Sequence, residues 1–381
     1  MFTTKVVEMI GKIIKILEAS MLFPFIWDTK SNTLDVTKSK YSRVFSIIFF
    51  SYYPSYILFS ACQLYRAVND KSLNASVMDI SWICMYGVAY YVAGEGVVGP
   101  FLKKYEQANL FRKIVNFDKI LSDLNVKDNA VRRLNAEKLA VLLSKSHVIG
   151  FFSLLFLIFI VIITKPKAAQ FFYSVYPGHD FMSFMVFLSA EMFTRSINLA
   201  GMMLMQAWFI LSVAFLTIGI STVRKCSNFV SRKVSMYRCL FLINQFHNQC
   251  YVFTMIPSRI GFFGSFSVGL AVILIRLDHA ITGAEYFICL YAFLIFMITS
   301  FLFLHISGKV FKDSCDLGDA LLAEGWKSRS KLIRKMAKSL RPFGVRLGTI
   351  RTLSYAALSA FYITLVSILT TVLNAFPPHE M

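Results

Sequence analysis

The residues best suited to conducting ions lie near the C-terminal end of the chain, in the mostly apolar stretch Thr352–Asn374. Four polar residues recur there at steps of three, four and three: Thr364, Ser367, Thr371 and Asn374. On an α-helix this spacing places their hydroxyl and amide groups along one face. Several copies of such a helix around an axis would form a weakly selective cation pore, with Ile368 as an apolar gate. Helix packing is the alternative, since Ser and Thr let helices approach and can bond to their own backbone.

Three ionisable residues fall inside other apolar stretches, where charge is costly and its presence suggests a function. Glu191 and Arg195 are four residues apart, so they can pair on one face of a helix. One interpretation places them in an outward-facing ligand pocket, and another on a solvated extension of the helix. Glu95 lies near the inner end of an earlier apolar stretch. In a small-solute transporter, the alternative function, Glu95, Glu191 and Arg195 would be substrate or proton sites.

Aromatic residues are concentrated in the outer halves of the middle apolar stretches. The six that we consider for a pocket are Trp82, Tyr86, Tyr90, Phe187, Tyr286 and Tyr291. A small organic ligand needs an apolar cavity with a few polar groups, which Tyr and Trp provide. For any one of them, core packing or an interfacial aromatic belt remains an alternative.

Catalytic and metal-binding motifs are not apparent. The chain has no Gly-rich phosphate loop, His-Glu-x-x-His helix or nucleophile elbow. Cys226, Cys239, His247 and Cys250 are close in sequence, but their spacing matches no familiar zinc pattern. We therefore expect no enzymatic activity, no cofactor and no metal.

Composition places these residues in a membrane. The 381 residues are 56% hydrophobic and only 16% charged, whereas soluble domains are nearer 25% charged. A spanning helix needs roughly 20 mostly apolar residues. Seven stretches qualify: Val44–Leu64, Val77–Phe101, Val148–Thr164, Phe184–Ile220, Ile260–Leu277, Tyr286–Ile306 and Thr352–Asn374. We predict an all-α, polytopic membrane protein in which the fourth stretch projects beyond the bilayer or breaks near Gly201.

Basic residues set the expected orientation. Most of the 40 Lys and Arg residues fall in segments 1–43, 102–146, 221–257 and 307–350, which lie on one side in a seven-span arrangement. The positive-inside rule makes that side cytoplasmic. The N-terminus is then inside and the C-terminus outside, and the basic loops face anionic lipid rather than nucleic acid.

This layout gives segment 1–43 as cytoplasmic with an amphipathic helix, 44–374 as the seven-helix domain and 375–381 as a short extracellular tail. Asn74 begins the only glycosylation acceptor sequence and falls in the first outer loop. A G-protein-coupled receptor, a second alternative, would place its N-terminus outside. Its usual outer-loop disulfide cannot form here, because none of the seven Cys residues lies in a predicted outer loop.

The whole chain resembles the arthropod seven-transmembrane gustatory and odorant receptors in length, span number, inverted topology and basic inner loops. The resemblance is most specific in Ser339–Gly348 and the final span. Family members often end that span with Thr-Tyr, five hydrophobic residues and Gln-Phe. Here Ser367-Ile368 and Asn374-Ala375 occupy those places, so chemical character is kept at Ser367 and Asn374 and lost at Ile368 and Ala375.

The resemblance implies a ligand-gated, non-selective cation channel in the plasma membrane of sensory neurons. It implies a homo- or heterotetramer with related subunits, whose last helices surround the pore and whose inner helix ends form a cytoplasmic anchor. An outer-half pocket would bind a small-molecule tastant or odorant. Taste is favoured over smell, because the usual odorant-receptor endings are not apparent.

Overall fold

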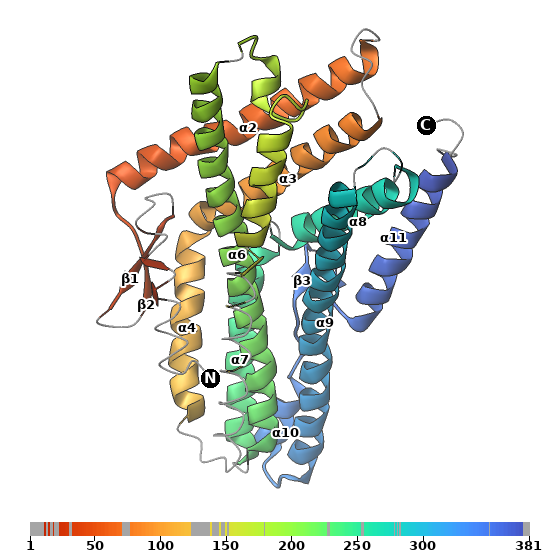
Figure 1. Ribbon diagram of the computed structural model, residues 1–381. Helices are drawn as coiled ribbons and strands as arrows, with labels where there is room; N and C mark the ends of the chain where they lie inside the picture. Colours follow the sequence, from red (N-terminus) through yellow and green to blue (C-terminus); the bar gives the residue numbers. More distant parts are fainter. Residues whose placement is uncertain are drawn as a thin grey trace.

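The chain folds as an assembly of long helices with two very small sheets (Figure 1). The computed structural model describes residues 11–12, 14–15, 18, 23–29, 33–70, 77–122, 138, 145, 149–150, 152–178, 180–226, 229–252, 255–277, 279, 281, 283–349 and 351–375. The predicted all-α class is confirmed. Asn74, most of the N-terminal amphipathic segment, residues 376–381 and the side chain of Glu95 lie outside the described part.

Nine helices carry labels in Figure 1 or in the text below: α2 (Lys40–Asn69), α3 (Val77–Leu102), α4 (Lys104–Ser122), α6 (Phe181–Lys225), α7 (Val230–Tyr251), α8 (Met255–Arg276), α9 (Gly283–Lys327), α10 (Lys331–Lys338) and α11 (Tyr355–Ala375). A further helix covers Phe152–Thr164, and the short 3-10 helix η2 covers Phe172–Val175. In the described residues, each of the seven predicted spans coincides with one of these helices.

Helices α6 and α9 are each 45 residues long and connect the two ends of the molecule. Asp180 caps the start of α6 by accepting from the Ser183 backbone N–H at 2.8 Å, and Arg224 and Lys225 close its last turn. No break occurs at Gly201, which instead lets α6 approach α3: a Cβ there would lie 2.7 Å from Val97. The fourth stretch is therefore one continuous helix, and its projection beyond the bilayer stays a prediction.

Membrane-crossing capacity differs among the helices. Among the described residues, Phe181–Lys225, Cys289–Lys327 and Tyr355–Ala375 are long and apolar enough to cross a membrane, and Phe152–Thr164 and Ile260–Arg276 are shorter apolar helices. The last helix begins at Tyr355, three residues later than predicted, because Arg351–Thr352 forms strand β4. The number of crossings and the sides of the two termini stay predictions.

The half of the molecule opposite α2 and α3 is a bundle in which α4, α6, α7 and α9 run side by side (Figure 1). Its core contains fully buried Val213, Leu240 and Val310 from α6, α7 and α9. Lys233 of α7 pairs with Glu324 of α9 at 2.9 Å near the end of the bundle. Helix α7 falls in the segment 221–257 that the charge pattern assigns to the cytoplasm.

The stretch Ser339–Gly348, in which the family resemblance is most specific, is an extended segment held by this bundle. The Asn244 and Asn248 side chains of α7 both donate to the Gly344 carbonyl at 3.1 Å, and Asn248 accepts from the Arg346 backbone N–H at 3.0 Å. From α9, the Ser314 hydroxyl donates to the Phe343 carbonyl at 2.6 Å. These contacts fix the chain immediately before α11.

Two antiparallel hairpins complete the fold. Strands β1 (Phe25–Asp28) and β2 (Thr33–Val36) pair beside α4, where the Trp27 ring packs edge-on against Phe111 with 5.7 Å between ring centres. Strands β3 (Arg346–Leu347) and β4 (Arg351–Thr352) turn the chain into α11. Gly348 takes φ +57° in that turn, a conformation that disfavours residues with a Cβ. The β1–β2 hairpin was not predicted from the sequence.

Candidate ligand cavity and pore helix

Arg195 and Glu191 form a buried ion pair on α6. The Arg195 Nε lies 3.2 Å from the Glu191 Oε2, and the two side chains are only 7% and 2% exposed. Their spacing of four residues brings them together on one helical face. The solvated-extension interpretation is therefore wrong, because water does not surround this pair.

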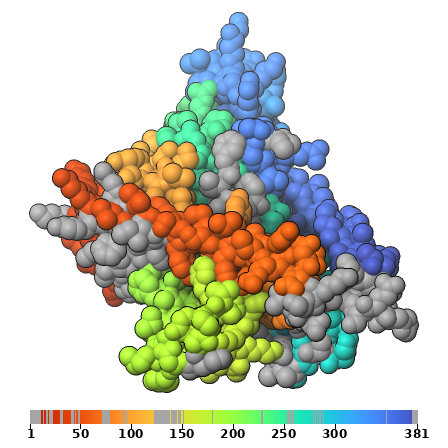
Figure 2. Space-filling model, turned by 90° about the horizontal axis from the view of Figure 1, so that it is seen from above, coloured from red at the N-terminus to blue at the C-terminus, as the bar shows by residue number. Residues whose placement is uncertain are grey.

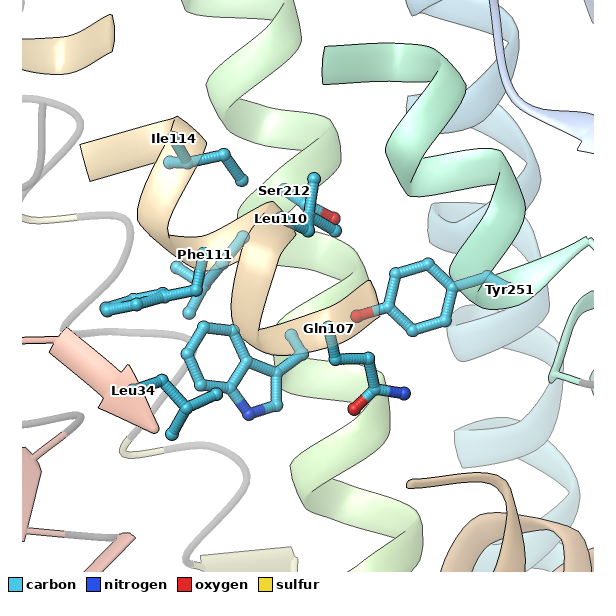
Figure 3. A pocket seen from close by; sticks show the side chains of 9 residues that line it. Leu34, Gln107, Leu110, Phe111, Ile114, Ser212 and Tyr251 are labelled. Atoms are coloured by element: carbon cyan, nitrogen blue, oxygen red, sulfur yellow. The ribbon is translucent and has the colours of Figure 1, made fainter. Parts of the chain in front are cut away.

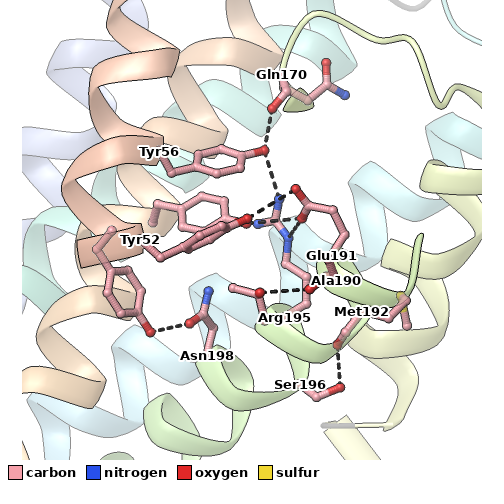
Figure 4. A network of polar contacts seen from close by, with 12 residues as sticks. Tyr52, Tyr56, Gln170, Ala190, Glu191, Met192, Arg195, Ser196 and Asn198 are labelled. Atoms are coloured by element: carbon pink, nitrogen blue, oxygen red, sulfur yellow. Dashed lines mark hydrogen bonds and ion pairs between the residues drawn. The ribbon is translucent and has the colours of Figure 1, made fainter. Parts of the chain in front are cut away.

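Tyrosines from α2 and α3 surround the pair, as Figure 4 shows. The Tyr90 hydroxyl donates to Glu191 Oε2 at 3.2 Å, and Tyr52 donates to Oε1 at 3.5 Å. Arg195 Nη2 donates to the Tyr56 hydroxyl at 3.3 Å, and Tyr56 in turn donates to the Gln170 carbonyl. A buried charge pair needs hydrogen-bond partners for its remaining groups, and these hydroxyls provide them for both Glu191 oxygens and for one N–H of Arg195 Nη2.

The guanidinium also lies over three aromatic rings. Its central carbon is 4.2 Å from the centre of the Tyr90 ring, 4.7 Å from Tyr86 and 5.5 Å from Tyr56. A desolvated cation over an aromatic face gains about 2 kcal/mol or more. The rings thus help to hold Arg195 in place.

A cavity of about 210 Å³ opens beside this network. Four elements supply most of its wall: α3, the helix Phe152–Thr164, α6 and α8, with Cys289, Ala292 and Phe296 added by α9. Trp82, Tyr86 and Arg195 line it, together with apolar side chains such as Leu157, Met202 and Phe266. A mostly apolar enclosure with a few polar groups is the usual form of a small-molecule site.

The eight side chains predicted for a ligand pocket divide into three groups. Trp82, Tyr86 and Arg195 line the cavity. Tyr90 and Glu191 do not line it but contact Arg195, Glu191 as its ion-pair partner and Tyr90 through its ring. Phe187 instead stacks on Tyr173 with 5.0 Å between ring centres. Tyr286 and Tyr291 lie on α9 away from the lining, and Tyr291 is 45% exposed.

Sequence reasoning missed several residues of this site. Asn198 lines the cavity one turn after Arg195, and its carbonyl oxygen accepts from the Tyr53 hydroxyl. The step of three from Arg195 could have indicated Asn198, because it puts both on one helical face. The tyrosines of α2 and the phenylalanines of α8 and α9 sit in uniformly apolar stretches that gave no such signal.

A second, much smaller cavity lies in the bundle between α4, α6 and α7 (Figure 3). It measures about 10 Å³, which is room for at most one water molecule. Gln107, Ser212 and Tyr251 contribute its polar groups. It is too small for an organic ligand.

Metal binding finds no support in the part of the chain that the structure describes. No group of three or more His, Cys, Asp or Glu side chains there is close enough to hold an ion. His247, considered above with three cysteines, is fully buried and bonded through Nδ1 to Ser212 Oγ at 2.8 Å.

Helix α11 packs against the rest of the chain along one side only. Leu365 is its single buried residue, and it faces α8 where a Cβ on Gly264 would lie 3.2 Å from it. Tyr362 donates to the Met297 carbonyl of α9 at 3.0 Å. Figure 2 shows the C-terminal part of the chain in blue along one edge of the molecule.

The predicted polar face of α11 is not used for packing inside the chain. All five predicted pore residues are exposed: Thr364, Ser367, Ile368, Thr371 and Asn374. Thr364 and Thr371 satisfy their hydroxyls on the carbonyls four residues earlier, at 2.8 and 2.9 Å. Packing against this chain's own helices therefore does not explain the polar face.

Two solved structures share this fold along nearly the whole chain. The insect olfactory receptor OR5 from Machilis hrabei superposes with a TM-score of 0.63 at 13% identity, and the match covers 98% of each chain. The same receptor in complex with eugenol gives a TM-score of 0.64 at 12% identity and the same coverage. No protein-family model and no curated protein sequence matches the chain.

Proposed function

We propose that this chain, which has the fold of an insect olfactory receptor, is a chemosensory receptor that works as a ligand-gated, non-selective cation channel. The observation that carries the proposal is the cavity of about 210 Å³ between α3, α6, α8 and the helix Phe152–Thr164. One of the solved structures that share the fold is a complex with eugenol, a small organic molecule. A small-molecule tastant or odorant is the corresponding ligand here, with taste favoured over smell.

The pore, in this proposal, is formed by α11 from four related subunits in the plasma membrane of a sensory neuron. The support is that α11 leaves its polar face uncovered while its other side is held by α8 and α9. Hydroxyl and amide dipoles without fixed charge suit a weakly selective cation path. The bundle of α4, α6, α7 and α9 would be the cytoplasmic anchor.

Coupling between cavity and pore would run through α8. Phe262, Phe266 and Leu270 of this helix line the cavity, and Gly264 meets Leu365 of α11. A ligand can shift the closed–open equilibrium only if it binds one state better. Ligand contacts with α8 would therefore transmit a difference in binding between the closed and open states to α11.

The test is whole-cell current evoked by sugars, bitter compounds and volatiles, compared between the native chain and Ala292→Phe. Ala292 lines the cavity, so the larger ring removes ligand space and we expect at least a tenfold loss of ligand sensitivity. Ala190→Phe, which places the same ring on the exposed face of α6, is the control. Currents with unchanged ligand sensitivity in Ala292→Phe would contradict the assignment of this cavity.

A further inference from the structure

Among the described lining residues, the charged and amide groups of the cavity wall lie on one short strip of α6. It consists of Arg195 and Asn198, three residues apart, while the other α6 lining residues, Leu199 and Met202, are apolar. Every ligand that enters must therefore satisfy any polar group of its own mainly at this strip, with Tyr86 and Trp82 beside it.

The strip offers hydrogen-bond donors, because its acceptors are already engaged. The Glu191 carboxylate accepts from Tyr52, Tyr90 and Arg195 and does not line the cavity. The Asn198 carbonyl oxygen accepts from Tyr53. A guanidinium has five N–H groups, and in the described structure Arg195 uses Nε and one N–H of Nη2. The amide N–H₂ of Asn198 adds further donors.

Charge at the strip is balanced. Arg195 is neutralised by Glu191 at 3.2 Å, so an additional carboxylate would find a cation that is already paired. A ligand ammonium would find no carboxylate among the lining residues that the structure describes. Either ion would be desolvated in an apolar enclosure without a partner, which costs several kcal/mol.

Resting on the proposed receptor function, we propose that the cavity selects uncharged, mainly apolar molecules carrying one hydrogen-bond-accepting oxygen, which Arg195 and Asn198 hold. The volume of about 210 Å³ is below the usual ~300–1,000 Å³ of ligand pockets, so the fitting skeleton is a single ring or a short chain. Ketones, aldehydes, esters and ethers of that size form the class.

Acetophenone and α-methylstyrene test this class, because they differ only by a carbonyl oxygen in place of a methylene group. Binding to the full chain in lipid nanodiscs is followed by the fluorescence of Trp82, which lines the cavity, with Trp82→Phe to identify its signal. Concentrations are matched in the membrane, since the hydrocarbon partitions more strongly. We expect acetophenone to bind at least tenfold more tightly, as for a hydrogen bond from a charged donor, and benzoate not to bind.

Removal of the ion pair distinguishes the hydrogen bond donated by Arg195 from the apolar contribution to binding. In Glu191→Gln/Arg195→Met, the ketone preference should fall to threefold or less while the hydrocarbon still binds. The control Lys103→Met/Glu106→Gln removes a partly exposed pair of α4 and its preceding turn and should keep the full preference. Asn198→Leu, which leaves the ion pair intact, should reduce the preference and serves if the double variant does not fold.

Equal binding of ketone and hydrocarbon to the native chain would overturn the proposal, as would binding of benzoate. If the ketone preference survives in both Glu191→Gln/Arg195→Met and Asn198→Leu, the strip does not recognise the ligand. If neither compound binds, the cavity is not the ligand site. Current evoked equally by hydrocarbons and ketones would support the receptor channel but contradict the requirement for a hydrogen-bond-accepting oxygen on the ligand. No evoked current from chain present at the cell surface would count against the proposed function itself.

Discussion

At the scale of single residues, Glu191 links three helices through one buried carboxylate. Its two oxygens accept from Arg195, Tyr90 and Tyr52, which lie on three different helices. Sequence spacing could predict that Glu191 and Arg195 pair, since residues four apart share a helical face. It could not predict their burial, because that depends on tyrosines of α2 and α3 more than 100 positions away.

Glu191→Gln should destabilise the protein strongly, because it leaves the charge of Arg195 buried without a counter-ion. Loss of one partner of a buried pair costs about 3–5 kcal/mol. Glu106→Gln, which breaks a pair whose side chains are 36% and 37% exposed, should cost about 1 kcal/mol or less. Thermal unfolding of the two purified variants measures the difference, and equal melting temperatures would contradict this role of the ion pair.

His247 should make the stability of the bundle of α4, α6, α7 and α9 sensitive to acid. Burial lowers the pKa of His247 from 6.5 to about 3. Because the folded pKa lies below the unfolded pKa, the unfolded chain binds the proton more readily, and stability is full above pH 6.5 and falls below it. Between pH 7 and pH 5 the His247 contribution should amount to about 2 kcal/mol.

Denaturation of the native chain and His247→Phe over pH 5–8 measures this contribution. The native chain should lose stability toward pH 5 more steeply than the variant, whose phenylalanine remains neutral. If the free energy of unfolding falls with pH equally in the two proteins, the pKa of His247 is not lowered in the folded state.

At the scale of elements, apolar length predicted a helix at each of the seven stretches, but it did not predict α4 or α10. It also did not predict which side chains contact one another. The continuous 45-residue α6 follows from a proline-free apolar run that ends in Arg224 and Lys225. The β1–β2 hairpin was missed because its two four-residue strands are stabilised by packing on α4 rather than by a strong local signal. The start of α11 was placed too early because the extended segment before it is held by Asn244 and Asn248, which are distant in sequence.

Asn248→Leu should weaken the attachment of the segment before α11 to the bundle of α4, α6, α7 and α9. It removes one of the two hydrogen bonds to the Gly344 carbonyl, which keeps the one from Asn244, and it removes the acceptor of the Arg346 N–H, whose loss costs about 1–3 kcal/mol. Gln249→Leu, the adjacent exposed position of α7, should change the melting temperature little. Hydrogen exchange of residues 343–347 should quicken in Asn248→Leu alone, and unchanged protection there would contradict the attachment.

At the scale of the whole molecule, the charge pattern predicts that the inner bundle faces the cytoplasm. The basic α10 region lies at the end of the molecule away from α2 and the C-terminal end of α11 (Figure 1). An epitope added at the C-terminus should therefore be labelled on intact cells, and one added at the N-terminus only after permeabilisation. The reverse pattern would invert the topology and place the cavity on the cytoplasmic side.

The central claim is that α11 lines a cation pore, and ligand-evoked whole-cell current with Thr371→Leu and Asn374→Ala tests it most directly. Both side chains are exposed on the polar face of α11, so neither substitution disturbs a buried contact within the chain. If they face the pore, relative cation permeability or conductance should change severalfold while surface expression stays constant. Robust current with native selectivity and conductance in both variants would contradict a pore formed by this face.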